Sequence, residues 1–299
     1  MTVTARSINP KDENFFGEID GVDLKADLDR DAIAAIEQAM DRYAVCVVRG
    51  QFLDDEQQIE FSSKLGELSY AINYGREKGQ VARLRRELYD ISNLDEGDAI
   101  LGDNDRRRIL READRLWHTN RSFIPADTTY SLLSGREVPL EGGNTEFADM
   151  RAAYDALPEA MKRRIEGLSC EHSIWHSRVL AGAKPENIRD DERAAMPGAV
   201  QPLVRIHART GRKSLVLASH VARVIGLPDE EGRALLAELT QFALQDRFTY
   251  SHRWSVGELV IWDNRCTMHR GTPFDDKRYR RDMRRTTVQN PKAAMAAAE

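Results

Sequence analysis

The sequence predicts a mainly β fold, a barrel of short strands with helices packed around it. The last third of the chain consists of short β-rich runs broken by Gly and Asn, a texture typical of a barrel rather than of a parallel α/β sheet. Helical periodicity is confined to a few segments. The chain has 299 residues, 41% of them hydrophobic, which is enough for one large core. We therefore expect a single domain over residues 1–299.

The first elements are two helices and a strand. Residues 30–43 carry apolar side chains at helical spacing, and the apolar run 44–50 after them predicts a buried strand that ends at Gly50. Asp54 or Asp55 begins the next helix, because aspartate is a favoured N-cap residue.

Residues 75–116, here called the arginine-rich excursion, differ in character. They are rich in Arg, Asp and Gly and contain little to bury. We expect a long excursion over the surface, or a lid, interrupted by a short strand at residues 88–93. Its arginines could help to recruit an anionic substrate, but solvated side chains are the favoured interpretation.

From Trp117 onward, strands dominate. In chain order we expect a strand at 128–138, a turn and strand at 141–147, a helix at 149–168, two strands within 202–219 around a turn at 209–213, a helix at 228–244, β-rich runs at 247–271 and 280–288, and a frayed tail at 291–299.

Composition excludes several classes of protein. Charged residues make up 31% of the chain and the net charge is −5, which is unlike a nucleic-acid-binding protein. The cysteines Cys46, Cys170 and Cys266 lie far apart and indicate neither disulfides nor zinc. Neither a signal peptide nor a membrane-spanning run is evident. We expect a cytoplasmic homo-oligomer without nucleic-acid or membrane partners.

Two histidines have distinctive surroundings. His118 lies in LWHTN at the start of the β-rich half, and His269 lies in VIWDNRCTMHRG after an apolar strand. Taken singly, each is more simply a hydrogen-bonded core or surface histidine. Their separation along the chain does not show whether the two histidines lie close in space, because only the fold could bring them together.

Other histidines and the tryptophans carry weaker signals. His207 and His220 flank the predicted turn at 209–213 and either line a pocket or are structural. His172 and His176 could form a metal pair on a helix, but no third ligand accompanies them. We expect Trp117 and Trp262 to pack inside the barrel near the two distinctive histidines.

Four sequence motifs occur along the chain in this order: LWHTN, GGNTEFADMRAAYDAL, GELVIWDNRCTMHRG and RRDMRRTTV. Together they resemble the family of taurine dioxygenase and 2,4-dichlorophenoxyacetate dioxygenase (TauD/TfdA), closer to the phenoxyacetate branch. The resemblance implies a double-stranded β-helix, a cupin-like jelly roll, with non-haem Fe(II) and 2-oxoglutarate as co-substrate. His118 matches the first histidine of the family's His-x-acid motif and His269 the distal one, as a metal site with open positions for the 2-oxo acid and dioxygen requires.

The resemblance also implies an anchor for the distal carboxylate of 2-oxoglutarate. Thr145 matches its hydroxyl, and Arg281 matches its guanidinium if one residue is inserted after His269; Arg280 is the fallback. Arg285 lies on the same strand face as Arg281 and, in the family, points at the acidic group of the substrate. A surface cation is the alternative for Arg285.

Asn120 departs from the family pattern, because the motif ends in Asp or Glu there. Its amide is neutral and should hold Fe(II) less tightly than a carboxylate. Three interpretations stay open. Asn120 is an introduced change that traps a complex, a natural ligand that binds through oxygen, or the mark of a natural variant with lost or altered chemistry.

The expected function is that of an Fe(II)/2-oxoglutarate-dependent dioxygenase that uses dioxygen to hydroxylate a small anionic organic acid. An aryloxyalkanoate, whose ether the reaction would cleave, is the first candidate substrate, and a sulfonate is the second. The alternative is a catalytically weakened or silent homologue that binds a 2-oxo acid, and Asn120 is the residue that supports it.

Overall fold

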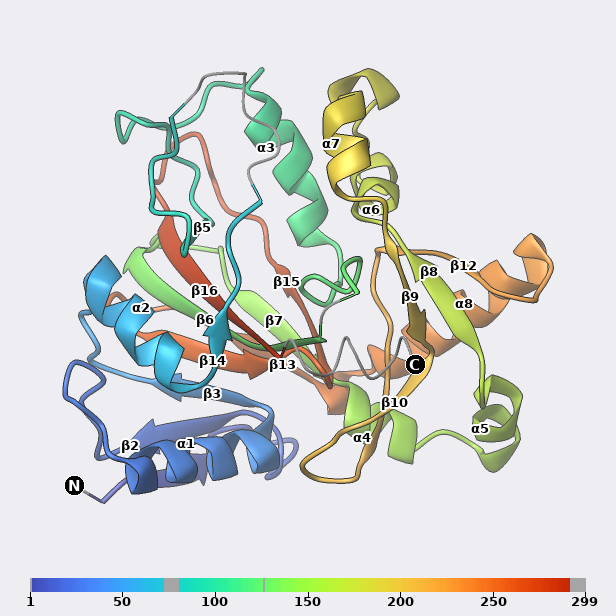
Figure 1. The fold of residues 1–299 in the computed structure, drawn as a ribbon, viewed down its shortest axis with the longest axis horizontal. Coiled ribbons are helices and arrows are strands. Elements are labelled where there is room, and N and C mark those ends of the chain that lie inside the picture. Colours follow the sequence, from blue (N-terminus) through green and yellow to red (C-terminus); the bar gives the residue numbers. More distant parts are fainter. Residues whose placement is uncertain (1, 73–80, 126, 291–299) are drawn as a thin grey trace.

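The computed structural model describes residues 2–72, 81–125 and 127–290 (Figure 1). Its centre is a jelly roll of two facing sheets. The larger sheet contains, in spatial order, β1 (Thr4–Ser7), β2 (Gly17–Asp20), β3 (Val45–Val48), β14 (Leu259–Asp263), β6 (Asp127–Glu137), β16 (Asp282–Asn290) and β4 (Glu67–Leu68), with β5 (Tyr89–Asp90) also paired to β16. The smaller sheet contains β13 (Thr249–His252), β7 (Thr145–Asp149) and β15 (Thr267–Gly271).

Side chains alternate between the two faces of each strand, and the larger sheet buries apolar side chains on both of its faces. In β14, Val260 and Trp262 pack between the sheets, whereas Leu259 and Ile261 point to the opposite face. Phe147 of the smaller sheet joins the inner cluster. The predicted mainly β, jelly-roll fold is confirmed.

Two helices cover the outer face of the larger sheet, α1 (Arg30–Tyr43) and α2 (Asp55–Lys64). Each begins where an aspartate caps free amides, Asp29 for α1 and Asp54, in a capping box with Gln57, for α2. The predicted helix 30–43 is confirmed, and so is the helix predicted to begin at Asp54 or Asp55, since Asp54 is the N-cap and Asp55 the first helical residue.

A second group of elements forms further sheets and helices beside the jelly roll. It comprises the sheet of β12 (Val221–Val224), β8 (Ser169–His172) and β9 (Ala199–Pro202), the hairpin β10 (Val204–Ile206) and β11 (Lys213–Leu215), and the helices α4 (Met150–Asp155), α5 (Glu159–Ile165), α6 (Ile174–Leu180), α7 (Asp190–Ala195) and α8 (Asp229–Ala243), with the short 3-10 turns η2 (Pro185–Asn187) and η3 (Asp246–Phe248).

The prediction of a single helix at 149–168 is wrong. The chain forms α4, breaks, and continues as α5, with Pro158 as the N-cap residue of α5. Proline has no N–H to donate and disfavours helical backbone at the residue before it, so no helix runs through Leu157 and α4 ends at Asp155.

The arginine-rich excursion is also more buried than its composition suggests. Its described part, 81–116, contains β5, α3 (Arg106–Arg111) and η1 (Glu112–Arg115). The buried apolar side chains are Leu84, Leu88, Leu94, Leu101, Leu110 and Ala113. The expectation that this stretch has little to bury is therefore wrong, and α3 packs beside α6 (Figure 1). Residues 75–80 and the tail 291–299 lie outside the described residues.

Two arginines of the excursion also correct the expectation of solvated side chains. Arg83 is 5% exposed and pairs with Asp90 and Asp282, and Arg107 is 6% exposed and pairs with Asp105. Arg83 therefore ties the excursion to β16. Within the described ranges, no helix has the length and apolarity needed to cross a membrane.

Candidate active site

His118 and His269 meet at the mouth of the jelly roll. His269 belongs to β15, and His118 follows η1. Their main chains form a reciprocal bridge, in which His118 N donates to His269 O at 3.0 Å and His269 N donates to His118 O at 2.9 Å. The two ring centroids lie 4.3 Å apart. The fold therefore brings together the two histidines that the sequence singled out.

Both imidazoles suit a metal. Burial lowers the pKa of His118 and lowers the pKa of His269 well below its usual value, so both rings are neutral at pH 7. His118 Nδ1 lies 2.7 Å from Leu116 O and must donate to it, because a carbonyl only accepts; its Nε2 keeps a lone pair. Among the described residues, His269 Nδ1 has no hydrogen-bond partner. Each ring thus retains a nitrogen for a ligand bond, which is the chemistry a metal requires.

Asn120 lies in the same place as the missing acid of the motif, but its amide is engaged. Its Nδ2 donates to Ser131 Oγ at 3.1 Å, and its Oδ1 accepts from Arg285 Nη1 at 2.7 Å. A guanidinium only donates, so the amide oxygen must face Arg285. A carbonyl oxygen has a second lone pair, so Asn120 can still offer a neutral oxygen to a metal, without the charge of a carboxylate.

A pocket beside His269, here called the inner pocket, contains the second predicted pair. Thr145, at the start of β7, and Arg281 line it together with Trp262 and Leu133. Thr145 Oγ1 accepts from Trp254 Nε1 at 2.9 Å, which leaves its own hydroxyl hydrogen for another acceptor. Thr145 can thus donate from its hydroxyl and Arg281 from its guanidinium, and a carboxylate can accept from both.

Arg281 and Arg280 lie in different surroundings. Arg281 Nη1 donates to Ile91 O at 3.1 Å, and burial lowers its pKa to about 10, so it remains charged at neutral pH. Arg280 is exposed and pairs with Glu137 at 2.8 Å. It does not line the inner pocket, so the structure favours Arg281 over Arg280 as the anion-binding arginine.

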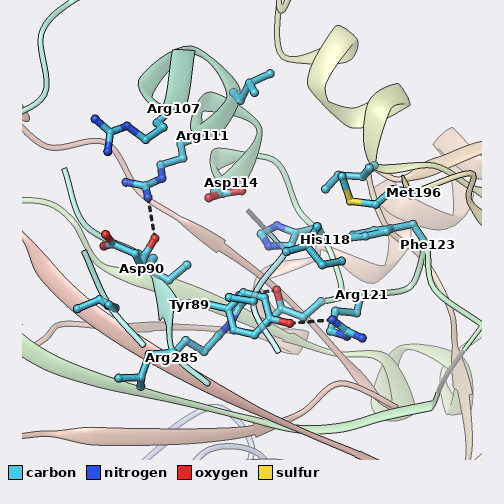
Figure 2. A pocket seen from close by; sticks show the side chains of 18 of the residues that line it. Tyr89, Asp90, Arg107, Arg111, Asp114, His118, Arg121, Phe123, Met196 and Arg285 are labelled. Atoms are coloured by element: carbon cyan, nitrogen blue, oxygen red, sulfur yellow. Dashed lines mark hydrogen bonds between the residues drawn. The ribbon is translucent and has the colours of Figure 1, made fainter. Parts of the chain in front are cut away.

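A second pocket, here called the outer pocket, opens on the other side of His118 (Figure 2). Its apolar walls include Phe123, Ile174 and Met196. Arg285 lies 4.6 Å above the ring of Tyr89, with which it is paired across β16 and β5. The two pockets share Ile91, Arg111, Asp114, His118 and Arg285.

Guanidinium groups line the outer pocket that His118 also lines. Arg121 donates to Tyr89 Oη at 2.7 Å (Figure 2). Arg178 Nη1 lies 3.0 Å from Asp114 Oδ1. Arg111 donates to the main-chain oxygen of Asp90 at 2.8 Å. These cations favour an anionic occupant.

The other histidines are structural or peripheral. His207 Nε2 lies 3.0 Å from Asp263, and His172 Nδ1 lies 3.0 Å from Ser122 Oγ. His172 ends β8 whereas His176 is in α6, so the two form no pair on one helix. His220 lines the outer pocket, as one of the two interpretations expected, whereas His207 does not.

One trio resembles a metal site by distance alone. Among the described residues, His207, Asp263 and Cys266 are the only His, Cys, Asp or Glu trio with ligand atoms all within 4.8 Å of one another. Arg265 binds both oxygens of Asp263, at 2.9 and 2.6 Å, so this carboxylate is already neutralised by a cation. The trio is an ion-pair network and not a metal site.

Trp262 packs 4.8 Å from the ring of His269, as expected. Trp117 instead packs against the cluster around α4 and α8, with Arg270 over its ring. Sequence reasoning missed Tyr89 and Asp114, because neither residue lies in a motif that points to the site.

A jelly roll with two neutral histidines between two arginine-containing pockets defines a non-haem metal oxygenase. The sequence model of the "Taurine catabolism dioxygenase TauD, TfdA family" matches residues 5–287. The chain belongs to this family.

Individual relatives agree. The chain is 42% identical over 292 residues to an alpha-ketoglutarate-dependent 2,4-dichlorophenoxyacetate dioxygenase of Cupriavidus pinatubonensis, covering 96% of this chain and 98% of the relative. It is 40% identical over 292 residues to the enzyme of the same name from a Burkholderia species, covering 96% and 95%. The crystal structure of AAD-2 in complex with Mn(II) and N-oxalylglycine superposes with a TM-score of 0.91 at 41% identity, over 97% of this chain and 98% of that one. The family and the phenoxyacetate branch inferred from the motifs are confirmed, and the chain is an alpha-ketoglutarate-dependent dioxygenase by class.

Proposed function

We propose that the chain hydroxylates a small anionic organic acid, with 2-oxoglutarate and dioxygen as co-substrates, and that an aryloxyalkanoate is its first candidate substrate. One observation carries the proposal. Two pockets meet at His118, one with Thr145 and Arg281 and the other with Arg285 and apolar walls.

His118 and His269 would hold the metal through their neutral rings, and Asn120 would offer its amide oxygen as a third, weaker ligand. When bound, the metal lets dioxygen oxidise 2-oxoglutarate to succinate and carbon dioxide while a substrate C–H becomes C–OH. The protein's own task is to orient both acids and to exclude water from the buried side of the site.

Arg281 and Thr145 would bind the distal carboxylate of 2-oxoglutarate. Arg281 keeps its charge where burial leaves little water to compete, and Thr145 has its hydroxyl hydrogen available because Trp254 already donates to its oxygen. The pair therefore fixes the co-substrate at the end away from the metal.

Arg285 would bind the carboxylate of the substrate. The ring of Tyr89 and the amide oxygen of Asn120 hold its guanidinium in place. Phe123, Ile174 and Met196 form an apolar wall that suits an aryl ring. Hydroxylation beside an ether oxygen gives a hemiacetal, which collapses and cleaves the ether. The relatives named for 2,4-dichlorophenoxyacetate support this choice, and a sulfonate is the second candidate.

Asn120 supports a second candidate function, that of a weakened or silent protein that binds a 2-oxo acid without turnover. No carboxylate occupies its position, and its oxygen is shared with Arg285. Succinate release in the presence of Fe(II) and dioxygen separates the two functions.

The test is the anaerobic spectrum of the protein with Fe(II) and 2-oxoglutarate. A weak visible charge-transfer band is expected, and His118→Ala and His269→Ala should each abolish it. His176→Ala, which removes an exposed histidine of α6, should retain the band. An undiminished band in both metal-site variants contradicts the assignment. Aerobic incubation with 2,4-dichlorophenoxyacetate or taurine then shows which acid couples to succinate release.

A further inference from the structure

Asp114 is a carboxylate at the centre of the site with no role in the function proposed above. It belongs to η1 and lines both pockets together with His118 and Arg285. Its side chain is 36% exposed, and its Oδ1 pairs with Arg178 Nη1 at 3.0 Å. Figure 2 shows the side chains of Asp114 and His118 in the same pocket.

The surroundings keep Asp114 ionised. Burial alone would raise its pKa, but the guanidinium of Arg178 first, with those of Arg111 and Arg285, outweighs burial and lowers it. The carboxylate therefore carries a negative charge in the two pockets that His118 also lines.

Asp114 does not occupy the place of a metal ligand. Two atoms that bind one metal at about 2.1 Å each lie at most about 4.2 Å apart. Among the described residues, Asp114 belongs to no trio whose ligand atoms all lie within 4.8 Å of one another. Its contribution to a metal between His118 and His269 would be its charge and not a bond.

We propose that Asp114 supplies, from across the pocket, the negative charge that Asn120 does not bring to the metal held by His118 and His269. The inference rests on the proposed function. It assigns Asp114 as a positioning residue that stabilises the bound cation, while Asn120 serves as the neutral acceptor of Arg285. With neutral ligands at all three protein positions, the protein can compensate the charge of the metal only through a nearby carboxylate, and Asp114 is the carboxylate that lines both pockets together with His118.

The test is an anaerobic Mn(II) titration without 2-oxoglutarate, in which electron paramagnetic resonance measures free Mn(II). Asp114→Asn should weaken Mn(II) binding by roughly 10–100-fold, as other changes around metal ligands do. Asp114→Glu keeps the charge and should stay within about threefold of the original chain by the same reasoning. Glu112→Gln is the matched control, because it removes one carboxylate from the same short helix, paired there with Arg115. It should change the affinity less than about twofold, since the proposal depends on the position of Asp114 and not on the charge of the pocket.

A second arm separates charge from structure. Asn120→Asp should bind Mn(II) more tightly than the original chain, and adding Asn120→Asp to Asp114→Asn should restore most of the lost affinity. A merely structural loss at Asp114 would persist in the double variant. Thermal melting of each metal-free variant confirms that the fold is retained.

Three outcomes overturn the inference: unchanged affinity in Asp114→Asn, an equal loss in Glu112→Gln, or no rescue by Asn120→Asp. Failure of the proposed function looks different. In that case the original chain binds no Mn(II), or His118→Ala binds it equally well.

Discussion

Arg280 and Arg281 are neighbours in sequence but lie in different environments, one in solvent beside Glu137 and the other in the inner pocket. Two-pronged, charge-assisted hydrogen bonds to a carboxylate are worth on the order of 1.5–3 kcal/mol each. Arg281→Gln should therefore raise the 2-oxoglutarate concentration for half-maximal succinate formation by roughly tenfold or more, at about 1.4 kcal/mol per decade.

Arg280→Gln is the matched control and should leave this concentration unchanged, because its pair with Glu137 is exposed. The reverse result, an effect of Arg280 and none of Arg281, would mean that the insertion after His269 is placed wrongly.

At single positions, the sequence predicted the site residues that belong to a motif and missed those that only the fold brings to the site. His118 and His269 stood in motifs and meet in the structure. Asp114, Tyr89 and Ser131 are ordinary residues whose proximity to the site depends on η1, β5 and β6 packing together, which no local pattern encodes.

Among the elements, β5 depends on one buried ion network. Arg83 pairs with Asp90 of β5 at 3.1 Å and with Asp282 of β16 at 2.7 Å, and all three side chains are under 10% exposed. Arg83→Ala would leave both carboxylates without this cation, and breaking such buried pairs costs about 3–5 kcal/mol. We expect a corresponding loss in the free energy of unfolding measured with urea.

The control for Arg83 is Arg223→Ala, because Arg223 pairs with Glu171 at 2.6 Å on the surface, where both side chains are more than 40% exposed. Such a pair contributes about 0–1 kcal/mol. A similar effect of the two substitutions would show that the Arg83 network does not hold β5 to β16.

Element boundaries were predictable where local chemistry sets them. Asp29 and Asp54 begin helices because their side chains cap free amides, and this information is local to the sequence. The excursion was misjudged because Leu84, Leu94 and Leu110 are irregularly spaced, so no periodicity indicated their burial.

For the whole molecule, buried neutral histidines set the response to acid. Burial lowers the pKa of His172 to about 4 and holds that of His220 well below its usual value. In the unfolded chain these groups titrate near pH 6.5, so the unfolded state binds more protons below that pH and stability is lost as the pH falls. Each such histidine contributes a slope of about 1.4 kcal/mol per pH unit, for His172 until about pH 4.

Urea midpoints at pH 7.5, 6 and 5 measure this slope on metal-free protein. The lowered pKa values of Asp90 and Asp282 add a further loss only below about pH 5, where carboxylates of the unfolded chain begin to bind protons. His172→Gln should flatten the slope between pH 6 and 5. A midpoint that does not change between pH 7.5 and 5 would refute the assignment of neutral buried histidines.

The reciprocal main-chain bridge between His118 and His269 has a consequence for the speed and entropy of metal capture. Side chains anchored on paired backbone need no loop to fold around an arriving ion, so binding carries little ordering entropy. Exchange of water on the ion, rather than a search by the chain, then limits the rate of entry. The apo and metal-loaded proteins should accordingly share one backbone at this bridge, and the amides of both histidines should resist hydrogen exchange before any metal arrives.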